Sequence, residues 1–116
     1  IYGAVDGIAI YDSHNNLIRN NEIKENQSGI RASINSSGNY IEQNRVTNNE
    51  NGIYLYDNAN INYIISNLIE KNTKGVYIKN ATGNLVQDSL RVDGNKIEMK
   101  LDDYTTSEYN FIQKID

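Results

Sequence analysis

Apolar residues along the chain come in short alternating groups. Ile53 and Leu55, and Val76 and Ile78, each place two aliphatic side chains two residues apart. This alternation is typical of a β-strand with one face turned inward. Asparagine, glycine and serine separate the groups, and these residues suit corners because they accept positive φ angles or bond nearby backbone. The pattern therefore predicts short strands joined by tight corners.

The same groups recur every 22 or 23 residues. Glycines followed by an aliphatic residue lie at Gly7, Gly29, Gly52 and Gly75. Polar columns in phase with them are Asn16, Asn39, Asn62, Asn84 and Asn110, then Asn21, Asn44, Asn67 and Ser89, then Asn26, Asn49, Asn72 and Asn95. An aliphatic column contains Ile18, Ile41, Ile64, Val86 and Ile112. Several columns in phase indicate one unit repeated about five times, each with three short strands.

Such a repeat predicts an all-β fold, a right-handed parallel β-helix in which each coil pairs with the next at the ordinary strand spacing of about 4.8 Å. The expected units within this single segment are 7–28, 29–51, 52–74, 75–95 and 96–116. In the last unit we expect Lys96 in the place of the glycine, Ile97 and Met99 inward, and a longer outer corner over 102–109. Neither end supplies an amphipathic capping helix, so we expect a fragment of a longer helix, packed against further coils or another chain.

Composition excludes several classes of function. The chain has 116 residues, twenty asparagines, no proline and no cysteine, so it contains neither disulfides nor thiolate metal sites. Its net charge is −4 and no basic cluster is present, which argues against nucleic acid as a partner. No apolar run approaches the roughly 20 residues of a membrane span.

Two rows of residues are expected to point outward from the first strand of each unit, at two and four positions after the glycine. They are Ala9, Arg31, Tyr54, Tyr77 and Glu98, and Tyr11, Ser33, Tyr56, Lys79 and Lys100. Aromatic rings stack on sugar rings and cations pair with uronate carboxylates, so these rows suit an anionic polysaccharide. The candidate substrate-binding residues are Tyr54, Tyr56, Tyr77, Lys79 and Lys100. The alternative is that tyrosine is simply a good solvent-facing strand residue.

The only histidine lies in the stretch Tyr11, Asp12, Ser13, His14. The tyrosine-aspartate pair returns two repeats later at Tyr56 and Asp57. Most of this stretch therefore belongs to the repeat, and only His14 does not. An isolated histidine at a turn is more often inert than catalytic.

The stretches GIAIYDSHNNLIRNNEIKEN and GIYLYDNANINYIISNLIEKN resemble the β-helix repeats of the mannuronan (alginate) C-5 epimerases. They also resemble related, pectate-lyase-like right-handed β-helix proteins, which include a periplasmic copper-binding group linked to nitrous-oxide reductase maturation. The likeness covers about residues 5–95 and implies a secreted, cell-surface or periplasmic location. It implies no cofactor beyond the calcium that is common in this fold, for which Asp12, Asp102 and Asp103 are available; no spaced ligand loop is present, and no metal ligands are assigned.

In the epimerases a tyrosine-aspartate-serine-histidine coil precedes a catalytic Asp-Pro-His motif. In this chain Arg31, Ala32 and Ser33 stand where that motif would fall. Epimerisation or elimination at a uronate needs an acid, a base and a neutralising cation. The candidate catalytic set is Tyr11 and His14 as acid and base, Asp12 to orient His14, and Arg31 as the neutralising cation.

Two functions follow from these observations. The first is a segment of a secreted polysaccharide-active protein, an epimerase or lyase that binds an anionic polysaccharide along one strand face. The second is a non-catalytic β-helix stalk or carbohydrate-binding module of a surface or periplasmic protein.

Overall fold

The computed structural model describes residues 1–91, 94–102 and 110–115. The described residues form strands and corners only. The first face of the stack contains β1 (Asp6–Tyr11), β4 (Ser28–Ser33), β7 (Asn51–Tyr56), β10 (Lys74–Lys79) and β12 (Ile97–Asp102). The second face contains β2 (Leu17–Arg19), β5 (Tyr40–Glu42) and β8 (Tyr63–Ile65), and the third contains β3 (Glu22–Lys24), β6 (Arg45–Thr47) and β9 (Leu68–Glu70). The remaining strands are β11 (Leu85–Arg91) and β13 (Phe111–Ile115).

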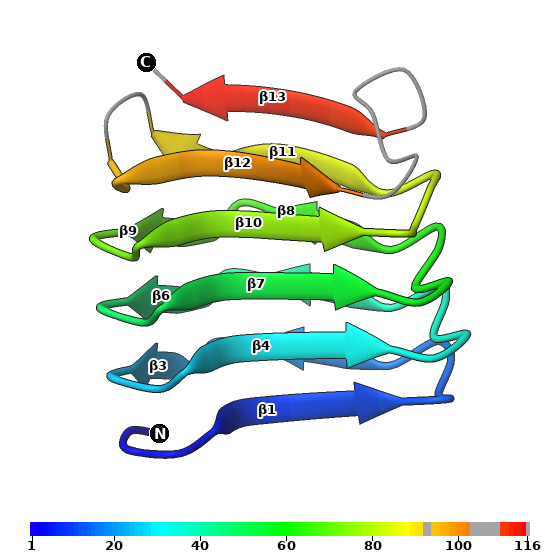
Figure 1. Ribbon diagram of the computed structural model, residues 1–116, viewed down its shortest axis with the longest axis horizontal. Helices are drawn as coiled ribbons and strands as arrows, with labels where there is room; N and C mark the ends of the chain where they lie inside the picture. Colours follow the sequence, from blue (N-terminus) through cyan, green and yellow to red (C-terminus); the bar gives the residue numbers. More distant parts are fainter. Residues whose placement is uncertain (92–93, 103–109, 116) are drawn as a thin grey trace.

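All paired strands are parallel, and each strand of the first face lies beside its counterpart one coil away, in the order β1-β4-β7-β10-β12. In Figure 1 these strands run from left to right in front, the fainter strands behind run back, and the chain climbs one layer at each return, so the helix is right-handed. The predicted parallel β-helix is confirmed, with about four turns between β1 and β12.

Aliphatic side chains stack inside the coils. Ile18 pairs in register with Ile41, which pairs with Ile64, and Ile64 pairs with Val86. The last three are fully buried, and each contributes roughly 1.5–3 kcal/mol through removal from water. The predicted aliphatic column is therefore the core; the side chain of Ile112, its last member, lies outside the described residues.

The predicted polar columns are continuous hydrogen-bonded ladders. The main-chain N–H and the Nδ2 of Asn39 both donate to the Oδ1 of Asn62, at 3.1 and 3.0 Å. The Nδ2 of Asn39 also donates backward to the carbonyl of Ser13. Each buried amide thus serves the backbone at a corner, which satisfies groups that would otherwise be costly to bury.

The residue before each ladder position from Asn16 to Ser89 has a positive φ angle. In the first ladder these residues are Asn15, Gly38, Ile61 and Gly83, with φ between 55° and 71°. Asparagine and glycine adopt this conformation readily, whereas isoleucine is disfavoured there. The chain therefore bends at the same place in every coil, including where the residue does not favour the bend.

The glycine column is required by close approach between coils. A Cβ built on Gly29 would lie 2.5 Å from the carbonyl oxygen of Gly52 and 2.8 Å from the side chain of Val46. A Cβ on Gly7 would meet the oxygen of Gly29 at 2.6 Å. These glycines do not have positive φ angles. Glycine is therefore required here because it has no side chain, and not because of its backbone freedom.

The expected register of the last unit is wrong. Lys74 pairs with Ile97 and Val76 with Met99, so Glu98 and not Lys96 follows the glycine column. Lys100 consequently lies beside Tyr77 rather than beside Lys79, whose partner is Asp102. The asparagine column keeps its interval of 23 from Asn72 to Asn95, and this spacing sets the register of β12.

The fourth coil does not have three separate strands, unlike the coils before it. β11 is long enough to span two faces, because Leu85 pairs with Tyr63 on the second face while Leu90 pairs with Ile69 on the third. β13 pairs with β11 and covers this side of the stack. The corner was predicted over 102–109; Asp102 is the last residue of β12, and residues 103–109 lie outside the described residues.

Candidate functional site

Arg31 is the most connected of the candidate catalytic residues. It lies on β4, and its Nε donates to the Asp6 carboxylate at 2.9 Å. Its Nη1 donates to the hydroxyl of Tyr56 at 2.8 Å and to that of Ser33 at 3.1 Å. The guanidinium carbon also lies 5.9 Å from the centre of the Tyr56 ring. This cation is therefore bound by the protein on three coils.

The same contacts keep Arg31 charged. Burial alone would lower the pKa of its guanidinium, but the hydrogen bond to Tyr56 and the carboxylate of Asp6 outweigh burial and raise that pKa above its ordinary value. A uronate carboxylate would have to compete with Asp6 for this cation. The arrangement suits a structural ion pair better than an open site for an anion.

His14 lies past the corner that follows β1 and is exposed. Its Nδ1 is 2.9 Å from the hydroxyl of Ser37 and accepts the main-chain N–H of Ser37 at 3.2 Å. This contact orients the ring, and among the hydrogen bonds and ion pairs of the described residues there is none between His14 and Asp12. Tyr11 is 62% exposed and Asp12 has a φ of 43° at the corner.

The candidate catalytic residues therefore do not share one set of contacts. His14 is bound to the next coil through Ser37, whereas Arg31 reaches across the first face toward Asp6. Their assignment to catalysis stays a prediction. The sequence did not single out Asp6 or Ser37, although both lie about one coil from their partners, and a search for opposite charges at that separation would have found the pair of Asp6 and Arg31.

The candidate substrate-binding tyrosines form one stack of rings. The ring of Tyr54 lies 4.6 Å from that of Tyr77, nearly parallel at 11°, and 4.5 Å from that of Tyr56. Beyond Tyr77, the Nζ of Lys100 lies 5.3 Å from the ring centre. With Arg31 over Tyr56, a cation stands at each end of this stack, which we call the tyrosine stack.

These ring contacts reduce the surface open to a sugar. A pyranose binds to an aromatic ring through the ring face, and Tyr54 already uses its faces on two neighbours. Lys100 also pairs with Asp102 at 3.8 Å, and the hydroxyl of Tyr77 donates to the same carboxylate. Lys79 lies in register between Tyr56 and Asp102. The tyrosine stack is thus bound together along the helix axis.

Residues 1–112 match the family model described as periplasmic copper-binding protein (NosD). The chain belongs to the NosD family. The family is periplasmic, in agreement with the expected location outside the cytoplasm. No curated protein and no solved structure matches the chain.

The described residues contain no helix of the length and apolar character needed to cross a bilayer. The resemblance to mannuronan epimerases stays a prediction, because the NosD match establishes the β-helix family and no enzyme within it.

The name of the NosD family raises the question of a copper site. Copper in proteins is bound by histidine, cysteine and methionine, and this chain has one histidine, one methionine and no cysteine. Met99 packs against the core of the last coil, and its counterpart in the coil of His14 is Ile8, four coils away, or about 19 Å along the axis at the usual strand spacing. Within residues 1–91, 94–102 and 110–115, no three histidine, cysteine, aspartate or glutamate side chains are grouped to bind a metal. These donors do not fit copper.

The described candidate aspartates, Asp12 and Asp102, do not lie together as ligands of one calcium ion. Asp12 lies at the first-coil corner, whereas Asp102 pairs with Lys100 in the last coil. Asp103 lies outside the described residues.

Proposed function

We propose that this chain is a non-catalytic β-helix stalk of a periplasmic protein. One observation carries the proposal: Arg31, the cation that uronate chemistry would need, is bonded to Asp6, Ser33 and Tyr56. A group that neutralises a substrate carboxylate has to be positioned toward the substrate rather than paired within the protein. The ladders and the tyrosine stack supply rigidity along the axis, which is what a stalk requires.

Turnover of a uronate polymer tests this proposal. The purified chain is incubated with polymannuronate and with polygalacturonate, and unsaturated products and epimerised residues are followed by ultraviolet absorbance and proton NMR. We expect neither product. Turnover that disappears in His14→Ala, with an unchanged circular dichroism spectrum, would overturn the stalk proposal.

Copper titration tests the same proposal against the copper binding that the family's description names. We expect Cu(I) and Cu(II) to show no stoichiometric complex with the chain in equilibrium dialysis. A one-to-one complex that is lost in His14→Ala or in Met99→Leu would contradict this expectation. Met99→Leu is a suitable variant because it conserves volume in a packed position.

Binding of an anionic polysaccharide along the first face is a second candidate function. The observation in its favour is that Lys100, with a side chain 41% exposed, and the tyrosine stack occupy one face. Calorimetry with oligouronates is the measurement, with Lys100→Ala as the variant and Lys24→Ala on the third face as the matched control. Binding that weakens in the first variant only would support this candidate; equal binding in both would remove it.

A further inference from the structure

Among the described residues, Asn51 is a buried asparagine whose side-chain oxygen has no hydrogen-bond partner. It is only 8% exposed, and its Nδ2 donates to the hydroxyl of Ser28 at the long distance of 3.5 Å. Asn49, two residues earlier in a ladder, instead accepts from Asn26 at 2.9 Å and donates to Asn72 at 3.0 Å. A buried amide that is so weakly bound needs a physical explanation.

Lys74 is the neighbour of Asn51 on the next coil. The two residues pair in register between β7 and β10, so their backbones lie about 4.8 Å apart and their side chains project from the same side of the sheet. The main-chain N–H of Lys74 donates to the carbonyl of Glu50 at 2.8 Å, which fixes this register. The side chain of Lys74 is 19% exposed. A primary amine is therefore held beside a buried carboxamide.

Glu50 adds a carboxylate to this pair. Its Oε1 accepts from the Nζ of Lys74 at 3.5 Å, and it directly precedes Asn51 in the chain. The same Nζ lies 5.7 Å from the centre of the Tyr77 ring. The Glu50 side chain is 53% exposed, so it can exchange protons with water while Asn51 stays covered. An amine, an acid–base group and an amide therefore meet at one place.

We propose that Lys74 and Asn51 become joined by an isopeptide bond between β7 and β10. The carboxylate of Glu50 accepts a proton from the ammonium group, and the freed amine attacks the Cγ of Asn51. The Nζ–Cγ bond forms and the Cγ–Nδ2 bond breaks. Glu50 passes its proton to Nδ2, which leaves as ammonia, and then takes the second proton that Nζ loses and releases it to water. No group is oxidised or reduced, so the step needs no co-reactant.

The local bonding favours this reaction at Asn51 rather than at a ladder asparagine. Reaction at Asn51 breaks the long bond to Ser28. Reaction at Asn72 would instead break the bonds of its Nδ2 to Val46 and Asn95, both at 2.9 Å. An amine held beside its target also acts at an effective concentration that can reach about 10⁵ M or more, which makes a slow condensation possible within a folded chain.

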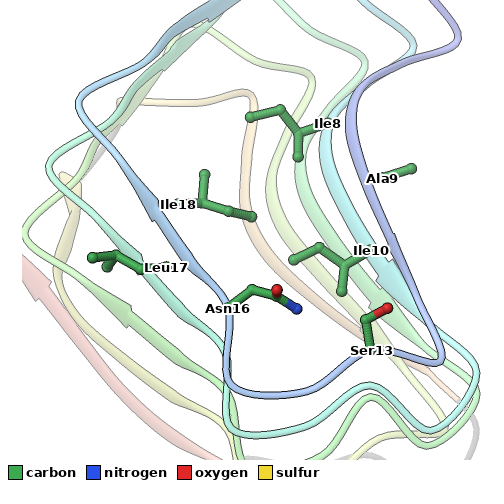
Figure 2. A pocket seen from close by; sticks show the side chains of 7 residues that line it. All are labelled: Ile8, Ala9, Ile10, Ser13, Asn16, Leu17 and Ile18. Carbon is green, nitrogen blue, oxygen red and sulfur yellow. The ribbon is translucent and has the colours of Figure 1, made fainter.

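The pocket in the first coil does not offer this chemistry. It has a volume of about 310 Å³, and Figure 2 shows that the side chains of Ile8, Ile10 and Ile18 lie around it. Asn16 is the residue there with a side-chain amide, and its Nδ2 donates to the Oδ1 of Asn39 at 3.0 Å. The described lining residues include no lysine, so no amine faces this amide.

The isopeptide bond links residues one coil apart and so joins β7 to β10 covalently. It closes a loop in the unfolded chain and removes conformational entropy there, as a disulfide does. The linked chain should therefore unfold at a higher urea concentration than an unlinked one. This consequence holds for a stalk and for a sugar-binding surface alike, so the inference does not rest on the proposed function.

The intact mass of the purified chain, measured in denaturant, tests the proposal. The main species should be lighter than the mass of its sequence by one ammonia. Lys74→Arg should keep the full mass of its sequence, because a guanidinium keeps the charge but does not attack the amide. Lys71→Arg is the matched control. Lys71 is exposed at the corner before β10, so this variant should still lose ammonia.

Glu50→Gln tests the part played by the carboxylate. Removal of the acid–base group should reduce the linked fraction at purification by about tenfold or more. Circular dichroism of each variant confirms that it is folded. A linked fraction equal to that of the original chain would overturn the mechanism given to Glu50.

Peptide mapping locates the bond. Trypsin does not cleave after a lysine whose amine is acylated, so the linked chain should give a branched peptide in which residues 46–71 are joined to residues 72–79. An unchanged intact mass, or the small gain in mass that deamidation of Asn51 would give, would overturn the proposal. A loss of ammonia that persists in Lys74→Arg would overturn it as well.

Discussion

Asn62 and Asn84 are joined by two hydrogen bonds, because the main-chain N–H and the Nδ2 of Asn62 both donate to the Oδ1 of Asn84, at 2.9 and 3.1 Å. Asn62 accepts the same pair of bonds from Asn39 and donates to the carbonyl of Ser36. One buried side chain thus serves backbone and side-chain groups in neighbouring coils.

Asn62→Ala should destabilise the chain by about 3 kcal/mol. The substitution leaves the main-chain N–H of Asn39 and the carbonyl of Ser36 without these partners, and the Oδ1 of Asn84 keeps only the main-chain N–H of residue 62 as a donor. Buried unsatisfied groups cost about 1–3 kcal/mol each. Urea unfolding is the measurement. Asn16→Ala is the control, because Asn16 is exposed at the open end of the same ladder, and it should cost less than half as much. Equal losses would show that the ladder is not what stabilises the coils.

Gly29→Ala should cost about 1–3 kcal/mol, the usual penalty of overpacking, because the new methyl group would lie 2.5 Å from the carbonyl of Gly52. Gly3→Ala is a useful comparison. No atom lies within 4 Å of its Cβ, but its φ is 76°, so only the backbone preference of about 1 kcal/mol is lost. Thermal unfolding of both variants separates close approach from backbone preference.

Ile61→Asn should stabilise the chain by about 1 kcal/mol. Ile61 has a φ of 55° and is 54% exposed, so it loses little burial while a left-handed conformation costs a branched side chain about 1–2 kcal/mol. Asn15 holds the same corner in the first coil with a φ of 58°. Ile65→Asn makes the same chemical change within β8 and should be neutral or destabilising. A loss of stability in Ile61→Asn would show that the corner tolerates isoleucine without strain.

Arg31 and Asp6 should show a coupling of about 1–2 kcal/mol in a double-mutant cycle with Arg31→Met and Asp6→Asn, since charged hydrogen bonds in partly buried sites reach this range. The raised pKa of Arg31 means that its contribution is complete below the ordinary arginine pKa and is lost only as pH rises through the higher folded value. The coupling should therefore be the same at neutral and mildly alkaline pH. The exposed pair of Lys24 and Glu22, 3.4 Å apart, is the control and should couple by less than about 0.5 kcal/mol.

The fold could be read from the sequence because stacking makes equivalent positions identical in environment. Asn39 and Asn62, or Ile41 and Ile64, are chemically alike because each supports the other, so the columns give the register of the coils directly. The last coil is an exception because the glycine column ends at Gly75 and the sequence predicts Lys96 as its successor. Glu98 occupies that place, and only the asparagine spacing pointed to it.

The candidate site was less predictable because its side chains are long. The direction of the first-face residues follows from alternation, but the partners of Arg31 depend on how its side chain lies, which carries it toward Asp6 and Tyr56 rather than toward His14. Ring stacking among Tyr54, Tyr56 and Tyr77 likewise depends on side-chain rotation. The separation of about one coil marks Tyr54 and Tyr77, and Asp6 and Arg31, as neighbours, but it does not show how their side chains are turned.

The asparagine ladders give the solenoid a dipole along its axis. From the second coil on, the amide oxygens in the three columns accept from the preceding coil and so point toward the N-terminal end, as Asn62 and Asn72 show at two different corners. An amide group has a dipole of about 3.5 D, and parallel dipoles in a column add as they do along a helix. The N-terminal rim is therefore the negative pole of the solenoid, and positively charged groups are favoured there over negatively charged ones.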